Sequence, residues 1–313
     1  MMIIPSSFPV SENLNELVKK TIEYEKASFS KGTILTYQSR CRHFQKWCEE
    51  IGRPFLPTSA ETIALYLSSI GQDVSFSTLD CAIAAIEAAH EKAGLFITGD
   101  KSLYLRVRKG IRRTHKHNQS IKQAPAISVL DLKGVCCKMS ASIFDIRDKA
   151  IITLAFFGAF RRSEVSALDF ENIEFTEKGI TVNILQSKTT DMNQTVYISY
   201  AKDKDICPVR ALNAWIYISE ITSGPIFRSI YKGGRVSPDR LSGPAISDII
   251  KKHFGDEYSG HSTRRGLITA SAEKGTPIHV IKKHSRHKNV NMVFTYIEHA
   301  KGFDESSVIT LGV

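Results

Sequence analysis

The sequence predicts a mainly α protein built from an N-terminal helical bundle and a C-terminal α+β domain with a small antiparallel sheet. Three observations predict this fold class. First, 313 residues are enough for two domains that each bury a core of their own. Second, apolar residues recur three or four positions apart along most of the chain, which is typical of helices. Third, only residues 179–200 alternate between apolar and polar in the manner of paired strands.

The helical bundle is expected over residues 11–113, because this part of the chain combines helical spacing with helix-capping residues. Thr58-x-x-Glu61 matches a capping box, which satisfies backbone N–H groups at the start of a helix, and Ser77 can cap the helix that follows. The expected helices run from Ser11 through Ile22, over Ile34–Cys48, after Glu61 through Leu67, over Leu79–Ala93 and over Leu103–Arg113.

Residues 114–126 are expected to form a linker, because His, Asn, Gln, Ser and Lys residues followed by Pro125 bury little apolar surface. The second domain is expected over residues 127–300, and a short C-terminal tail over residues 301–313. Its strands are expected over Gly179–Leu185 and Thr195–Tyr200. Its helices are expected over Val129–Met139, Ile143–Phe157, Val209–Ile221, Gly243–Phe254, His261–Lys274, Ile278–His284 and Asn289–His299.

Composition argues against several classes of protein. No run of about eighteen apolar residues is present, so we expect no membrane-spanning segment, and the first residues lack the basic start of a signal peptide. The six cysteines form no Cys-x-x-Cys pair and no zinc-binding spacing. We therefore expect reduced thiols in a cytoplasmic protein without a bound metal.

The net charge of +10 favours a polyanionic partner such as nucleic acid. One basic zone, between Lys101 and Lys122, contains no acidic residue, and another lies between Lys251 and Lys288. Two separate basic zones favour a clamp around a DNA duplex, whereas the alternative is a pair of solvated helix faces without a ligand. The candidate DNA-contact residues are Thr36, Arg40, Arg106, Arg108, Arg112, Arg113, Arg162 and Arg265.

The C-terminal domain contains residue types suited to attack on a phosphodiester without a metal. The transition state of that reaction gathers negative charge on the nonbridging oxygens, and a guanidinium group can donate paired hydrogen bonds to them. Arg161 and Arg264 are the candidates for this role. Tyr296 is the candidate nucleophile. Because a phenol has a pKa of about 10, it needs a base, for which His261 is the candidate.

Three further residues are candidates for supporting roles. Lys188, in a polar turn between the two expected strands, can protonate the departing 5′ oxygen as a general acid. His287 can hydrogen-bond a nonbridging oxygen. Glu164, one helical turn after Arg161, can hold Arg161 or His261 in place.

Several of these residues also have a structural interpretation. Tyr296 shares a helical face with apolar neighbours and can be a core residue. Arg161 follows three phenylalanines on an apolar helix, where a salt bridge to Glu164 can be its only role. His284 and His287 can bind zinc with another histidine, although such sites usually add a carboxylate or a third histidine in rigid geometry, and none stands out.

Taken in order, these segments resemble the motifs of the tyrosine recombinase, or phage integrase, family, and the resemblance covers nearly the whole chain. Ala159-Phe160-Arg161-Arg162-Ser163-Glu164 is similar to the first arginine motif of the family, and His261-Ser262-Thr263-Arg264 to its His-x-x-Arg box. His287, Tyr296 and Lys188 match the third-box histidine, the nucleophile and the hairpin lysine. One departure is Ser285-Arg286-His287, where the family often has Leu-Gly-His.

The resemblance implies that the N-terminal bundle is a core-binding domain with a SAM-like fold, and that it forms a C-shaped clamp on double-stranded DNA together with a catalytic domain. It implies site-specific recombination through a 3′-phosphotyrosyl intermediate and a Holliday junction, without a cofactor. It further implies a homo-tetramer on paired inverted-repeat sites, in association with the nucleoid. The C-terminal tail is expected either to dock on a neighbouring subunit or to pack on its own.

Two other functions are open at this point. A relaxing enzyme that resembles type IB topoisomerases uses the same arginine, lysine, histidine and tyrosine chemistry, but it needs neither paired sites nor a tail for assembly. A noncatalytic DNA-binding regulator with a degenerate site would bind DNA and form no covalent adduct.

Overall fold

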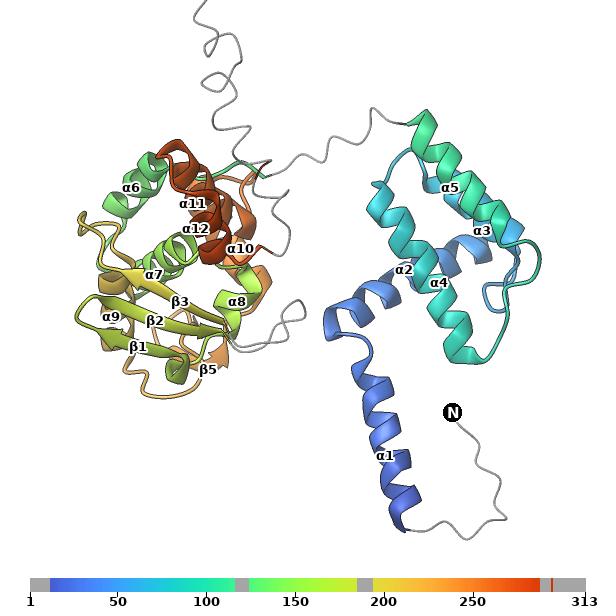
Figure 1. Cartoon of the computed structure of the whole chain (residues 1–313), viewed down its shortest axis with the longest axis horizontal. Coiled ribbons are helices and arrows are strands. Elements are labelled where there is room, and N and C mark those ends of the chain that lie inside the picture. The colour runs from blue at the N-terminus through green and yellow to red at the C-terminus, as the bar shows by residue number, and fades with distance from the viewer. Residues whose placement is uncertain (1–11, 116–123, 185–193, 288–293, 295–313) are drawn as a thin grey trace, which may run out of the picture. The chain divides into compact units, whose positions relative to one another are not determined.

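The computed structural model describes residues 12–115, 124–184, 194–287 and 294, and the chain divides into two compact units (Figure 1). The N-terminal unit comprises Met1–Lys122, and the C-terminal unit comprises Gln123–Val313. Helices make up most of both units, and the strands that the structure describes lie in the C-terminal unit, which confirms the mainly α fold class. Among the described helices, none is long and apolar enough to cross a membrane.

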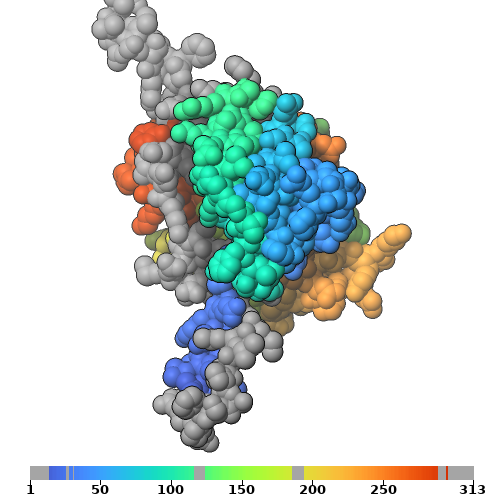
Figure 2. Space-filling model, turned by 90° about the vertical axis from the view of Figure 1, so that its right-hand side faces the viewer, coloured from blue at the N-terminus to red at the C-terminus, as the bar shows by residue number. Residues whose placement is uncertain are grey.

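The N-terminal unit is a bundle of helices around an aromatic core. Its described helices are α1 (Glu12–Ala27), α2 (Lys31–Glu50), α3 (Ala60–Ile70), α4 (Phe76–Ala93) and α5 (Ser102–Thr114). Phe44 of α2 and Tyr66 of α3 are buried with their ring centroids 4.9 Å apart, and Tyr104 of α5 is buried as well. α5, green in Figure 2, packs against α3 and has its other side at the surface of this unit.

Serine residues fix where three of these helices begin. Ser30, Ser59 and Ser75 have extended backbones, and each Oγ accepts the N–H of the residue three positions on at 3.2–3.3 Å. The expected caps at Thr58 and Ser77 are therefore wrong. Thr58 is buried, and its backbone N–H donates to Nε2 of His90 at 3.0 Å. Ser77 lies inside α4.

The C-terminal unit packs helices around an antiparallel sheet. Its described helices are α6 (Val129–Lys138), α7 (Ile143–Phe157), α8 (Arg162–Ala167), the 3-10 helix η2 (Phe170–Asn172), α9 (Pro208–Ser219), α10 (Gly243–Phe254), α11 (Gly260–Glu273) and α12 (Ile278–Ser285). Its described strands are β1 (Ile173–Thr176), β2 (Gly179–Ile184), β3 (Gln194–Ser199), β4 (Arg228–Ile230) and β5 (Val236–Arg240). The sheet has the order β1-β2-β3, and β4 pairs with β5 in a separate hairpin.

Helix α7 and one face of the sheet supply much of the core of this unit. Ile180 of β2 pairs with Ile198 of β3, and both side chains are buried. α7, light green near the centre of the unit in Figure 1, contacts α8, α9, α10 and α11. It buries side chains on several faces, as expected for a helix surrounded by other elements. α7 therefore fixes the positions of the helices that pack around it.

Three expectations fall on parts of the chain that the structure does not describe. The turn between β2 and β3, with Lys188, lies outside the described residues. So do the expected helix over Asn289–His299, apart from residue 294, and the tail over residues 301–313.

Candidate active site in the C-terminal unit

A sharp turn between α7 and α8 presents Arg161. α7 ends at Phe157, Ala159 has a left-handed backbone with φ of 45°, and Arg161 precedes α8 in an extended conformation. Gly158 is needed in this turn, because a Cβ there would lie 2.1 Å from the ring of the buried Phe160. Arg161 thus does not lie on the apolar helix itself, because α7 ends at Phe157, as expected, and the left-handed Ala159 separates the two.

Arg161 forms an ion pair with Glu164. Nη1 of Arg161 donates to Oε1 of Glu164 at 2.6 Å, and the backbone N–H of Arg161 donates to Oε2 at 2.9 Å. The Glu164 side chain is 4% exposed, whereas the Arg161 side chain is 30% exposed. The carboxylate thus fixes the arginine and leaves part of its guanidinium group at the surface. A salt bridge and an anion-binding role are compatible in this geometry.

The first turns of α11 carry His261 and Arg264. Ser259 Oγ accepts the N–H of His261 at 3.2 Å, and Ser262 Oγ accepts the N–H of Ser259 at 3.0 Å, so two serines cap the helix. Arg264 is buried, and its Nη1 donates to the carbonyl oxygen of Ala159 at 2.7 Å. This hydrogen bond joins α11 to the turn that presents Arg161.

The segment that enters the C-terminal unit is bound to the same helix. The N–H of Ile127 donates to the carbonyl oxygen of Ser262 at 3.1 Å, and the Ile127 side chain is fully buried. Gly266 permits this contact, because a Cβ there would lie 2.1 Å from the carbonyl oxygen of Ile127 and 2.6 Å from the ring of Phe156. α11 therefore packs directly on both α7 and residue 127.

His287 follows α12 and is 8% exposed. Its Nδ1 lies 2.7 Å from Ser285 Oγ, and Ser285 Oγ donates to the carbonyl oxygen of Ile281 at 2.7 Å. Because the hydroxyl group has a single proton, the network assigns a proton to Nδ1 of His287, which donates to Oγ. Nε2 of the neutral ring is then an acceptor. The expected hydrogen bond to a nonbridging oxygen therefore requires the imidazolium form of His287.

The zinc alternative for His284 and His287 has little support from the hydrogen bonds. Nε2 of His284 donates to the carbonyl oxygen of Phe157 at 2.7 Å, and Nδ1 of His287 donates to Ser285. One ring nitrogen of each histidine is thus already used within the protein fold.

Arg286, which the sequence reasoning did not select, belongs to the same cluster. It ends α12 with a left-handed backbone, φ 58°, and its side chain is 3% exposed. Its Nη2 lies 2.8 Å from Oε2 of Glu164. The signal in the sequence is the departure from Leu-Gly-His, because a left-handed residue that ends a helix is usually glycine.

Burial, together with the clustered arginines, lowers the basicity of two histidines. Desolvation around its ring, followed by the charges of Arg264 and Arg161, lowers the pKa of His261 below its ordinary value. The same causes lower the pKa of His287 to about 4. Both rings are therefore neutral at pH 7 in the free protein. The positive field around them favours an anion such as a phosphate or a phenolate.

The structure thus brings four of the six expected catalytic residues, Arg161, His261, Arg264 and His287, into one electropositive cluster with Glu164. Their roles are still predictions. The other two, the lysine at position 188 and the tyrosine at position 296, lie outside the described residues.

Two expected DNA-contact residues flank this cluster. Arg162 is exposed at the start of α8, and its Nη1 donates to Ser247 Oγ of α10 at 3.3 Å. Arg265, next to Arg264 on α11, is partly exposed. Their position beside the cluster is compatible with contacts to phosphates near a scissile bond.

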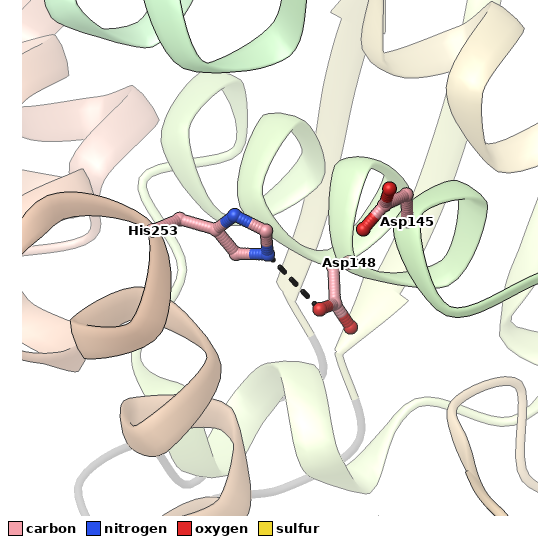
Figure 3. Close-up of side chains that lie close together, drawn as sticks. All are labelled: Asp145, Asp148 and His253. Carbon is pink, nitrogen blue, oxygen red and sulfur yellow. Dashed lines mark hydrogen bonds and ion pairs between the residues drawn. The ribbon is translucent and has the colours of Figure 1, made fainter. Parts of the chain in front are cut away.

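Among the described residues, another group of side chains lies close enough together to hold a metal ion. Ligand atoms of Asp145, Asp148 and His253 lie within 4.8 Å of one another (Figure 3). The buried carboxylate of Asp148 accepts hydrogen bonds from Arg147 at 2.8 Å, from Lys252 at 2.9 Å and from His253 at 3.0 Å. Burial raises the pKa of Asp148, but these donors outweigh burial and lower it to about 2. We interpret the group as an ionic tie between α7 and α10.

Two expected DNA-contact arginines of the N-terminal unit take part in ion pairs. Arg108 forms a bidentate pair with Asp80 of α4, in which Nη2 lies 2.7 Å from Oδ2. Nη2 of Arg106 lies 3.5 Å from Oδ2 of Asp100. Arg108 therefore ties α4 to α5, whatever else it contacts.

The other expected DNA-contact residues of this unit are less engaged. Arg112 and Arg113 are exposed in the last turn of α5, where the central carbon of the Arg112 guanidinium group lies 5.9 Å from the ring centroid of Phe76. Thr36 is exposed on α2, and Arg40 on the same helix is partly buried. The end of α5 therefore offers two guanidinium groups at the surface.

Comparisons with known proteins bear on this cluster. The model of the phage integrase family matches residues 129–302, the range that contains every residue of the cluster. A curated relative, the integrase/recombinase xerD homolog of Selenomonas ruminantium, is 30% identical over 322 residues, which cover 98% of this chain and 92% of the relative.

Two solved structures share the fold. The Tn1549 transposon integrase in complex with transposon right end DNA has a TM-score of 0.58 at 13% identity, over 95% of this chain and 98% of that chain. A lambda integrase dimer bound to a COC′ core site has a TM-score of 0.57 at 14% identity, over 92% of this chain and 95% of that chain. At such low identity, the similarity concerns the fold alone.

Proposed function

This chain belongs to the phage integrase family, and from that membership we propose that it is a site-specific DNA recombinase of the tyrosine type. The phenol of Tyr296 attacks the scissile phosphorus, forms a 3′-phosphotyrosyl bond and releases a 5′-hydroxyl group. Attack by another 5′-hydroxyl group reverses this step and rejoins the strand. Successive strand exchanges pass through a Holliday junction. No cofactor is needed, because the phosphotyrosyl ester retains the energy of the phosphodiester.

The observation that carries this proposal is the cluster of Arg161, His261, Arg264 and His287, which three separate segments of the chain supply. In the proposed mechanism, the two guanidinium groups meet the charge on the nonbridging oxygens. Neutral His261 accepts the proton of the phenol. His287 binds the phosphate as an imidazolium, because a bound anion raises its pKa. Lys188 protonates the 5′ oxygen.

The proposed partner is duplex DNA with paired inverted-repeat sites, bound by a homo-tetramer at the nucleoid. The relatives solved with DNA support a DNA partner. Arg112 and Arg113 would contact phosphates from the N-terminal unit, and Arg162 and Arg265 from the catalytic unit. The tail, residues 301–313, would dock on a neighbouring subunit. A largely apolar cavity of about 390 Å³ between β3, α11 and α12 is the candidate acceptor.

The test starts from a library of nicked DNA duplexes with randomised sequence, since the chain does not reveal its target. The nick lets the short 5′-hydroxyl fragment leave after cleavage, so that the covalent adduct accumulates. We expect the wild-type protein to form detergent-resistant adducts that peptide mapping assigns to Tyr296. Tyr296→Phe is expected to bind DNA normally and to give no adduct, because only the attacking oxygen is removed.

Tyr217→Phe is the matched control, because Tyr217 is 86% exposed on α9, and it is expected to form adducts at the wild-type rate. An adduct in Tyr296→Phe would place the nucleophile elsewhere. No adduct with the wild-type protein would favour a DNA-binding regulator. Relaxation of supercoiled DNA without resolution of a synthetic Holliday junction would favour a topoisomerase.

A further inference from the structure

Arg286 has a backbone conformation that favours glycine. It ends α12 with φ of 58°, where a Cβ crowds the following carbonyl group. Ala159 also has a positive φ, and the two strained residues are joined, because Nη2 of Arg286 donates to the carbonyl oxygen of Ala159 at 3.0 Å. Backbone strain at two hydrogen-bonded residues beside a candidate active site indicates that the side chain of Arg286 has a role there.

The guanidinium group of Arg286 is held on several sides. Nη1 donates to the carbonyl oxygen of Gly158 at 3.0 Å, and Nη2 donates to Ala159 at 3.0 Å and to Glu164 at 2.8 Å. Its central carbon lies 4.9 Å from the ring centroid of Phe160. Nη1 also donates to the carbonyl oxygen of His284 at 2.9 Å, and the other partners lie in the segment 158–164 that presents Arg161. The side chain is 3% exposed, so Arg286 acts through these neighbours and does not contact DNA itself.

Glu164 lies between two arginines. Its Oε1 accepts from Arg161 at 2.6 Å, and its Oε2 accepts from Arg286 at 2.8 Å. Two positive charges and one negative charge give this group a net charge of +1. Without Arg286, Arg161 and the buried carboxylate would cancel each other, and the group would attract a phosphate less strongly.

We propose that Arg286 is a positioning residue for DNA cleavage: it neutralises Glu164 and fixes the 158–161 turn, so that the charge of Arg161 acts on the scissile phosphate. This inference rests on the proposed function. The titration of Glu164 agrees with it. Burial alone raises the pKa of Glu164, and the charge of Arg286, together with Arg161, outweighs burial and lowers that pKa below its ordinary value.

The test compares Arg286→Met with the double variant Arg286→Met/Glu164→Gln on a nicked duplex recovered from the library. The rate constant of adduct formation is measured in a single turnover with protein in excess. Partial misfolding lowers the amplitude and leaves the rate constant unchanged. We expect Arg286→Met to react roughly ten- to a hundred-fold more slowly, as when a residue that orients a functional group is removed. The double variant is expected to be faster than Arg286→Met, because a neutral glutamine at position 164 no longer cancels the charge of Arg161.

A methylphosphonate at the scissile position supplies a second measurement. This group carries one negative charge fewer than a phosphate, so the charge of Arg161 matters less. The ratio of the wild-type rate to the Arg286→Met rate is therefore expected to shrink toward one. A purely structural defect would leave the ratio unchanged.

Two further variants complete the design. Arg235→Met is the matched control, because it removes an exposed guanidinium group 4.9 Å from the ring of Tyr231, and it is expected to react at the wild-type rate. Arg286→Lys keeps the charge near Glu164 and loses most of the hydrogen bonds, so it is expected to be slowed less than Arg286→Met. Should the methionine variant fail to fold, the comparison with and without Glu164→Gln is made in Arg286→Lys, where the proposal predicts no gain in rate.

Three results would overturn the proposal: a wild-type rate in Arg286→Met, a double variant slower than Arg286→Met, or an unchanged methylphosphonate ratio. A gain in rate when Glu164→Gln is added to Arg286→Lys would also overturn it. A wild-type protein that forms no adduct would instead contradict the proposed function, so the two failures can be told apart.

Discussion

Permanent charges set the protonation state of the titratable side chains around Arg161. Glu164 is ionised despite its burial, because two arginines contact its oxygens. His261 is neutral at pH 7, because desolvation and the nearby guanidinium groups disfavour a further positive charge. A neutral imidazole can accept a proton from a phenol, whereas an imidazolium cannot. The same arginines that favour a phosphate therefore keep the proposed base in its active form.

This arrangement predicts how cleavage depends on pH. We expect the second-order rate constant of adduct formation to rise as the pH falls from about 8, because His287 must gain a proton to bind the phosphate, and to level off once His261 is protonated, below the ordinary histidine pKa of about 6.5. The pH at which it levels off follows from the lowered pKa of His261, because protonation that inactivates the base then begins at a more acidic pH. The measurement is a series from about pH 5 to about pH 8 with DNA limiting, which reports on the free protein. A rate constant that is already level between about pH 7 and about pH 8 would contradict the assignment.

Residues that the chemistry of a phosphodiester requires could be predicted from the sequence. Residues that act through a contact with another side chain could not. Arg161, His261, Arg264 and His287 follow from what a phosphodiester requires, and the structure gathers them. Arg286 became visible only in the structure, because its partner Glu164 lies 122 positions away in the chain. A departure from an expected glycine was the one sequence feature that pointed to it.

Helices with strong apolar patterns agree closely with their predicted bounds. α7 and α10 begin and end at the expected residues, Ile143–Phe157 and Gly243–Phe254. Caps were harder to place, because several Ser and Thr residues near each start can accept the same N–H groups. Thr58 is not the cap, because its backbone N–H donates to His90 of α4. Tertiary contacts thus decide boundaries that local patterns leave open.

Short strands were missed for a related reason. β2 and β3 alternate over six residues each and were expected, but β1, β4 and β5 span four, three and five residues. β5 also contains Pro238, which cannot donate to a ladder and argues against a strand. The turn after Phe157 depends on the left-handed Ala159, a conformation that alanine rarely adopts.

The ionic tie between α7 and α10 predicts a pH-dependent contribution to stability. We expect Asp148→Asn to lower the free energy of unfolding at pH 7 by about 2–3 kcal/mol, because Arg147 and Lys252 lose their carboxylate partner. The pKa of Asp148 is about 2 in the folded protein and about 4 in the unfolded chain. The contribution is therefore fully present above about pH 4 and is lost as the pH falls toward about 2.

Urea unfolding of the wild type and the variant at several pH values measures this difference. It should be largest near neutral pH and shrink steadily in acid. Asp256→Asn provides a control, because Asp256 is exposed just after α10, and its stability is expected to match the wild type. A difference between Asp148→Asn and the wild type that stays constant in acid would contradict the ionic tie.

At the scale of the whole molecule, the excess of ten positive charges matters where the side chains are exposed and not paired with a carboxylate. Arg108 is partly buried and paired with Asp80, whereas Arg112 and Arg113 are exposed at the end of α5. A phosphate contact releases counterions from DNA, and each contact adds about 0.9 to the slope of log affinity against log salt. The two exposed arginines should therefore each contribute to the salt dependence of DNA binding.

We expect the double variant Arg112→Ala/Arg113→Ala to bind DNA more weakly and with a salt slope smaller by about 2. Fluorescence anisotropy with a labelled duplex at several salt concentrations measures the slope. The double variant Lys232→Ala/Arg235→Ala is the charge-matched control, because both residues are exposed in the turn between β4 and β5, and its slope is expected to match the wild type. Equal salt slopes for both double variants would contradict the prediction that the end of α5 contacts DNA.

Ile127 connects the segment that enters the C-terminal unit to α11. Its N–H is bonded to Ser262, and its carbonyl oxygen lies against Gly266, so tension in that segment is transmitted directly to α11. α11 carries His261 and Arg264. A force on this segment would thus reach the proposed base and one guanidinium group through a single residue.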